Sequence, residues 1–177
     1  MVFPRLLADD LFQAAKRLSP PKQWVLKEKS DGRETGRELE CLIEIEGAIR
    51  RGSAILIVIS AGNLDKCTMS LLARHGDVRT RHPIYRLDIN PTTPHRNPFV
   101  GPEALHGMRF SPGETHEHVY LDNLDVDGSL YERCDRVARP IQNPPSTFLE
   151  GLEYIRVRLH LQNVEEIPRP ETQGDLL

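Results

Sequence analysis

The sequence predicts an α+β fold, with a curved antiparallel sheet of about five to seven strands and a helix near each end of the chain. Residues 37–46 alternate apolar and acidic side chains, which is the pattern of a strand with one buried face. Residues 55–59 form a continuous aliphatic run, which we interpret as a central strand buried on both faces. The connections between the expected strands are too short for crossover helices, and this favours antiparallel order.

The expected elements follow one another along the whole chain. A short helix is expected after the capping residues Asp9 and Asp10, and Pro20–Pro21 would end it. Five expected strands begin near Trp24, Arg37, Ile55, Cys67 and Pro83.

Near the C-terminus, Thr147 and Glu150 have the spacing of a capping box at the start of a second helix. The apolar stripe of that helix comprises Phe148, Leu152, Ile155 and Leu159. We therefore expect a single domain over residues 1–167, with residues 168–177 forming a flexible tail.

Composition narrows the class of protein. The chain has 177 residues, 38% of them hydrophobic, which is enough for one core, and its net charge of −3 gives no global attraction to nucleic acid. It has no apolar run of membrane-spanning length and no secretory signal pattern, so no membrane association is predicted. Cys41, Cys67 and Cys134 are far apart and odd in number, and we expect reduced core residues in a cytoplasmic protein.

Residues 82–122 contain the candidate site. If residues 116–122 form one strand, His116, His118, Tyr120 and Asp122 project from the same face, while Val119 and Leu121 point to the other. Such a histidine pair could hold a metal ion or a phosphate, although pairs of this kind also occur as solvated surface residues. A zinc site would need His95 to complete the set of ligands, and the sequence alone favours a site without metal.

The turn from Pro94 to Pro98 presents His95, Arg96 and Asn97 on a backbone stiffened by proline at both ends. Between Arg74 and Arg96 there are five arginines and two aspartates, a local excess of three positive charges. Arginine forks match the geometry of phosphate oxygens. The turn is therefore a candidate for phosphate recognition.

Three short motifs, 87–90 (LDIN), 94–98 (PHRNP) and 116–120 (HEHVY), resemble a pattern in uncharacterised small bacterial proteins, some of which lie near toxin–antitoxin or phage-defence genes. The resemblance covers roughly residues 36–160. It implies a genomic setting and the position of a site, and it does not imply a reaction. Residues 112–118 (PGETHEH) also resemble the first metal motif of cupin barrels, but the later half of that pattern is missing.

These patterns favour a metal-independent phosphodiesterase, specifically an endoribonuclease of the toxin or defence type. His95 and one of His116 or His118 would act as general base and general acid, which requires side-chain nitrogens within about 8 Å of each other. Arg96 would stabilise the charge that develops on the phosphate, and Tyr120 would orient a histidine or the phosphate.

Arg86 and Asn97 are the expected substrate-binding residues, RNA is the expected partner, and no cofactor is predicted. The alternative is a non-catalytic phage or mobile-element protein that binds a host protein, such as an antitoxin or a defence complex. The acidic strand from Glu38 to Glu46 would then mimic nucleic acid or contact a basic partner.

Overall fold

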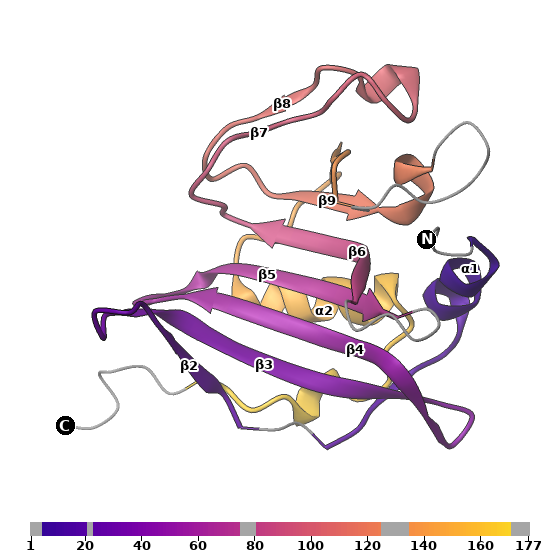
Figure 1. Cartoon of the computed structure of the whole chain (residues 1–177), viewed down its shortest axis with the longest axis vertical. Helices are drawn as coiled ribbons and strands as arrows, with labels where there is room; N and C mark the ends of the chain where they lie inside the picture. Colours follow the sequence, from indigo (N-terminus) through magenta and orange to yellow (C-terminus); the bar gives the residue numbers. More distant parts are fainter. Residues whose placement is uncertain (1–4, 21–22, 75–80, 125–134, 171–177) are drawn as a thin grey trace.

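The computed structural model describes residues 5–20, 23–74, 81–124 and 135–170 (Figure 1). The elements in chain order are α1 (Arg5–Gln13), β1 (Arg17–Leu18), β2 (Val25–Glu28), β3 (Glu34–Ile45), β4 (Ala48–Ser60), β5 (Asn63–Ala73), β6 (His82–Ile89), β7 (His95–Arg96), η1 (Glu103–Leu105), β8 (Arg109–Phe110), β9 (His116–Val119), η2 (Tyr120–Asn123), β10 (Arg139–Pro140), α2 (Phe148–Arg158) and η3 (Val164–Glu166).

Within this described part of the chain, eight strands form one open sheet in the order β1-β3-β4-β5-β6-β9-β10, with β2 also paired to β3. Every pair of neighbouring strands in it is antiparallel. Strands β7 and β8 form a separate two-stranded sheet, which Figure 1 shows beyond β9. The α+β class and the antiparallel order are confirmed. The sheet has more strands than predicted because β1 and β10 are two-residue strands, too short to leave a periodic pattern in the sequence.

The long strands follow the hydrophobic pattern with one exception. In β3, Leu39, Cys41 and Ile43 are fully buried, as the alternation predicts. In β4, however, Leu56 and Val58 are only half-buried, so this strand is not buried on both faces. Aliphatic residues occur in strands because they favour the extended backbone as well as because they are buried. In β4 this backbone preference explains Leu56 and Val58, which are not fully buried.

Helix α2 begins as predicted. The Thr147 hydroxyl accepts a hydrogen bond from the Glu150 backbone N–H, and the Glu150 carboxylate accepts one from the Thr147 backbone N–H, which completes the capping box. The helix packs against β5 and β6 and lies behind the sheet in Figure 1. At Gly151 the approach is so close that a Cβ atom would lie 2.3 Å from Ile89 Cδ1. Glycine is therefore the residue that lets α2 reach the sheet.

Helix α1 spans Arg5–Gln13, so Asp9 and Asp10 lie inside it and do not cap it as predicted. Lys16 follows the helix and is completely buried. Its ammonium donates hydrogen bonds to the carbonyls of Phe12 and Ala14 and, at 2.6 Å, to that of Leu159 after α2. Burial lowers the pKa of Lys16 to about 8. This side chain joins the C-terminal ends of the two helices.

Some sequence predictions fall on residues outside the described ranges, among them Cys134 and residues 171–177 of the expected tail. The first part of that tail is packed, because Trp24 Nε1 donates a 2.8 Å hydrogen bond to the Pro168 carbonyl. Cys41 and Cys67 are buried, and burial raises the pKa of their thiols to about 11 and about 12. None of the described helices is both long and apolar enough to cross a membrane.

Candidate functional site: a histidine cluster in a polar cleft

The register of β5, β6 and β9 builds the floor of the site. Directly opposed residues on neighbouring strands share a face of the sheet, so polar side chains line up across all three strands. Two rows result: Thr68–Asp88–His116 and Ser70–Arg86–His118. The intervening residues of β6 and β9 point to the other face, toward the two helices. The site therefore lies on the face opposite α1 and α2.

A third histidine reaches these rows from the separate β7–β8 sheet. The ring centroid of His95 lies 5.5 Å from that of His116 and 5.0 Å from that of His118, and the latter two rings are 5.2 Å apart. One side-chain nitrogen of each ring lies within 4.8 Å of the corresponding nitrogens of the other two. The predicted convergence of the two sequence motifs is confirmed. We call His95, His116 and His118 the histidine cluster.

The hydrogen bonds of Asn97 show which nitrogen of the neutral His95 ring carries the hydrogen. His95 Nε2 lies 3.0 Å from Asn97 Oδ1, and the same oxygen accepts a hydrogen bond from the Ala138 N–H. Asn97 Nδ2 donates to the carbonyls of Leu105 and Ala138, which fixes the orientation of the amide. Nε2 therefore carries the hydrogen in the neutral ring. The His95 ring also makes a hydrogen bond with the Arg136 backbone.

The other two histidines are held in a similar way. His116 Nδ1 lies 2.8 Å from the Glu114 carbonyl, which can only accept, so His116 Nε2 keeps the lone pair when the ring is neutral. His118 Nε2 lies 3.4 Å from Asp88 Oδ2, and His118 Nδ1 is buried with no hydrogen-bond partner among the described residues. Of the three rings, only that of His118 thus keeps a nitrogen without a partner among the described residues, because His116 Nε2 lies 3.6 Å from Asp88 Oδ2 and His95 also has a hydrogen bond with the Arg136 backbone.

Asp88 is the charged centre of the floor and is only 5% exposed. Its Oδ1 accepts hydrogen bonds from the Thr68 hydroxyl at 2.7 Å and from Arg86 Nε at 3.0 Å. Burial opposes ionisation, but the hydrogen bond from His118 and the charge of Arg86 outweigh it and hold the pKa of Asp88 well below its usual range. Asp88 is therefore a carboxylate at neutral pH.

Burial also determines the charge of two histidines. It lowers the pKa of His95, as does the nearby His118, whereas the hydrogen bonds with Asn97 and with the Arg136 backbone raise it. Burial is likewise the largest cause of the lowered pKa of His116. Both rings are therefore mainly neutral at pH 7.

The histidine cluster opens into a cleft of about 420 Å³ whose wall carries Arg86, Arg96 and Arg136. The Arg86 guanidinium is paired with Asp88 and, at 3.2 Å, with Asp135, so it supports the floor of the cleft. The Arg96 side chain is exposed and has no hydrogen bond or ion pair with any described residue. Arg96 is thus the guanidinium available to an anionic ligand. The role of Arg86 in substrate binding stays a prediction.

The structure places Tyr120 outside the cluster. Strand β9 ends at Val119, and residues Tyr120–Asn123 turn into the 3₁₀ helix η2, so the two-residue alternation stops before Tyr120. The Tyr120 hydroxyl instead donates to Asp9 of α1, and the ring packs against Phe12. Its predicted role in orienting a histidine is therefore wrong.

Because the strand ends at Val119, the residues after Tyr120 also lie elsewhere than predicted for a continuous strand. Asp122 forms a bidentate ion pair with Arg139 and does not join the histidines. Leu121 is 43% exposed, although Val119 is buried as predicted. Asn97 is also placed differently from the prediction, because its buried amide is fully used by internal hydrogen bonds. It positions His95 and has no group left for a substrate.

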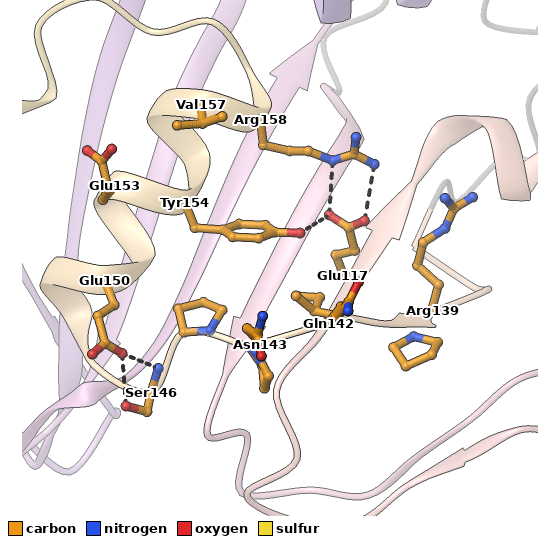
Figure 2. Close-up of a pocket in the computed structure, with 14 residues that line it drawn as sticks. Glu117, Arg139, Gln142, Asn143, Ser146, Glu150, Glu153, Tyr154, Val157 and Arg158 are labelled. Atoms are coloured by element: carbon orange, nitrogen blue, oxygen red, sulfur yellow. Dashed lines mark hydrogen bonds and ion pairs between the residues drawn. The ribbon is translucent and has the colours of Figure 1, made fainter.

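Glu117 lies between the two histidines of β9 and points to the opposite face of the sheet, where it is buried (Figure 2). Its carboxylate accepts hydrogen bonds from the hydroxyls of Tyr85 and Tyr154 and from Arg158. Figure 2 shows Tyr154 and Arg158 reaching it from α2, at the floor of a groove of about 950 Å³. Arg139 also lines this groove. The carboxylate therefore ties the strand that carries the histidines to the C-terminal helix.

Sequence reasoning missed Asp88 and Glu117. A signal was present for Asp88, because it is an acidic residue between Leu87 and Ile89, whereas Glu117 lies between two histidines and had no such signal. Their buried partners come from segments far apart in the chain, and no local pattern reveals those pairs. Comparisons of the chain with protein-family models, with curated protein sequences and with solved structures give no match.

Proposed function

We propose that the protein is a phosphodiesterase that cleaves RNA, with the histidine cluster as its active site. The observation that carries this proposal is the convergence of three imidazoles, from two segments of the chain, at a polar cleft beside the Arg96 guanidinium, which is not paired with any described residue. Histidines supply both members of a general acid–base pair near neutral pH, and a guanidinium supports the charge of a phosphate. The sequence prediction of a metal-independent endoribonuclease is retained in this form.

His95 is the general base in this mechanism. Its Nε2–H is held by Asn97, so Nδ1 is the nitrogen that accepts the proton of the ribose 2′-hydroxyl. The deprotonated oxygen attacks the adjacent phosphorus and the bond to the 5′-oxygen of the next nucleotide breaks. The lowered pKa of His95 supports this role, because the ring is neutral before the reaction.

His118 is the general acid. Asp88 Oδ2 lies 3.4 Å from His118 Nε2 and fixes the orientation of the ring. In the protonated ring Nδ1, which has no hydrogen-bond partner among the described residues, carries a hydrogen. This nitrogen is buried in the free protein, so RNA binding must expose it before the hydrogen is donated to the departing 5′-oxygen. The products are a 2′,3′-cyclic phosphate and a 5′-hydroxyl, and His116 packs against both reacting rings.

Arg96 contacts the non-bridging phosphate oxygens. Negative charge increases on these oxygens as the pentavalent transition state forms, and a planar two-pronged donor stabilises it. The alternative, a non-catalytic protein that binds a host partner through the acidic strand, has less support. Glu38 and Glu40 on that strand form ion pairs with Lys27 and Arg81, which reduces the negative charge of this face.

The test is cleavage of a mixed-sequence RNA by the full chain in the presence of EDTA. The wild type should cleave, while His95→Gln and His118→Gln should lose activity and remain folded by circular dichroism. His160→Asn is the matched control, because His160 is exposed, lies after α2 and has a left-handed backbone (φ 53°) that asparagine tolerates. Absence of cleavage by the wild type, or full activity in both cluster variants, would contradict the proposal. Loss of partner binding on charge reversal of the acidic strand would favour the alternative.

A further inference from the structure

We propose that His95, His116 and His118 form a binding site for one divalent transition-metal ion, with Zn²⁺ as the probe. This inference goes beyond the proposed phosphodiesterase, because it depends only on the ligand geometry and not on any reaction. Within the described ranges, this trio is the group of histidine, cysteine and acidic side chains whose ligand atoms gather closely enough to hold an ion. The sequence alone did not favour metal, since it could not show that His95 completes the set.

The first support comes from the hydrogen bonds on the far side of each ring. Metal-bound histidines almost always donate their second N–H to a carboxylate, a carbonyl or water, which fixes the ring and the tautomer. Here the acceptors are the Asn97 amide oxygen for His95, the Glu114 carbonyl for His116 and the Asp88 carboxylate for His118. Each ring thus has the kind of acceptor that orients a metal ligand. His116 Nε2 also lies 3.6 Å from Asp88 Oδ2, and His95 also has a hydrogen bond with the Arg136 backbone, so a bound ion would replace these two contacts.

The second support is an unsatisfied group. His118 is 2% exposed, and its Nδ1 has no hydrogen-bond partner among the described residues. A buried polar atom without a partner costs about 1–3 kcal/mol, so such atoms are usually found to have a ligand. A metal ion bound through Nδ1 would satisfy this nitrogen and would leave the contact between Nε2 and Asp88 in place.

The distances require only small adjustment. Tetrahedral coordination at about 2.0–2.1 Å places ligand nitrogens roughly 3.4 Å apart, and the three nitrogens here already lie within 4.8 Å of one another. His116 and His118 are fixed on β9, whereas His95 comes from the separate β7–β8 sheet and is half-buried. A rotation of the His95 side chain or a small shift of its strand would close the site. Three protein ligands facing a cleft leave the fourth position open, as in catalytic zinc sites.

The metal and the acid–base mechanism would use the same lone pairs. A metal ion coordinated by His95 removes the nitrogen that accepts a proton from RNA, so a saturating ion should inhibit the metal-free cleavage. A histidine coordinates the ion only in its neutral form, so protons compete with Zn²⁺ for the same nitrogens. Binding can therefore be measured without reference to cleavage, which keeps the two proposals separable.

The experiment is a calorimetric titration of the chelator-treated full chain with Zn²⁺ at pH 7.5, with the bound ion counted by elemental analysis after gel filtration. Wild type and His160→Asn should bind one ion per chain. His95→Gln and His118→Gln should lose stoichiometric binding, and Asp88→Asn, which weakens the hydrogen bond behind His118, should bind about 10–100-fold more weakly. Circular dichroism of each variant checks that it is folded.

Wild type that binds no stoichiometric Zn²⁺, or binding that is unchanged in both cluster variants, would overturn the metal site. Stoichiometric binding without any RNA cleavage by the metal-free chain would support the metal site and contradict the proposed phosphodiesterase. Cleavage that is undiminished at saturating Zn²⁺ would overturn the claim that ion and proton share the same nitrogens.

Discussion

Replacement of Asn97 by leucine tests whether His95 is positioned by a buried amide. Leucine keeps the branched shape but removes four hydrogen bonds, those with His95 Nε2, the Leu105 carbonyl and both backbone groups of Ala138. At about 1 kcal/mol for each bond, we expect the free energy of unfolding to fall by about 4 kcal/mol. For a chain of this size that corresponds to a melting temperature lower by roughly 8–16 °C. RNA cleavage measured well below this temperature should also fall, because His95 can then rotate and change its tautomer.

Asn123 provides the matched control. Its amide is also buried and makes four hydrogen bonds, with Val119, Arg136 and both backbone groups of Val137, but none with a histidine. Asn123→Leu should therefore lose a similar amount of stability in urea denaturation while it retains more cleavage activity than Asn97→Leu. A loss of less than about 1 kcal/mol in Asn97→Leu would refute the energetic argument. Equal loss of activity in the two variants would refute the positioning of His95.

Three further predictions concern single side chains. Arg96→Lys keeps the charge but loses the planar fork, so it should reduce RNA cleavage without lowering the melting temperature. The control is Arg109→Lys: Arg109 is exposed and lies opposite Arg96 on β8, and its replacement should change neither cleavage nor melting temperature. Tyr120→Phe should leave cleavage unchanged and cost about 1 kcal/mol of stability in urea, since it removes one hydrogen bond to α1. Gly151→Ala would place a Cβ 2.3 Å from Ile89 Cδ1, the end of a fully buried side chain. Overpacking of about 1–3 kcal/mol should exceed the roughly 1 kcal/mol that alanine gains in a helix, and an undiminished stability in urea would show that the Ile89 and Met69 side chains rearrange.

The sequence predicted the elements that are formed by interactions between residues close together in the chain. The alternation in β3 and the capping box of α2 each reflect interactions between residues close in sequence, and the structure contains both. The stiff turn around His95 and the histidine pair of β9 were also identifiable, because their residue types are unusual for the backbone they occupy. Their convergence was a prediction that only the tertiary structure could test.

The features that the sequence did not reveal depend on contacts between distant segments. Tyr120 was misplaced because a strand pattern cannot show where the strand ends and a 3₁₀ turn begins. Asp88 serves the site through a cross-strand register with His116 that no residue pattern encodes. Lys16 reads as a surface residue in the sequence, yet it is buried because three carbonyls at the ends of two helices surround its ammonium.

The most direct test of the proposed active site compares an RNA oligonucleotide with the 2′-deoxy oligonucleotide of the same sequence, in EDTA and with the product ends identified. In the proposed mechanism the 2′-hydroxyl gives its proton to His95 and attacks the phosphorus, so the deoxy strand has no nucleophile. We predict cleavage of the RNA alone, with 2′,3′-cyclic phosphate and 5′-hydroxyl ends. Cleavage of both strands at similar rates, or of neither, would contradict the account.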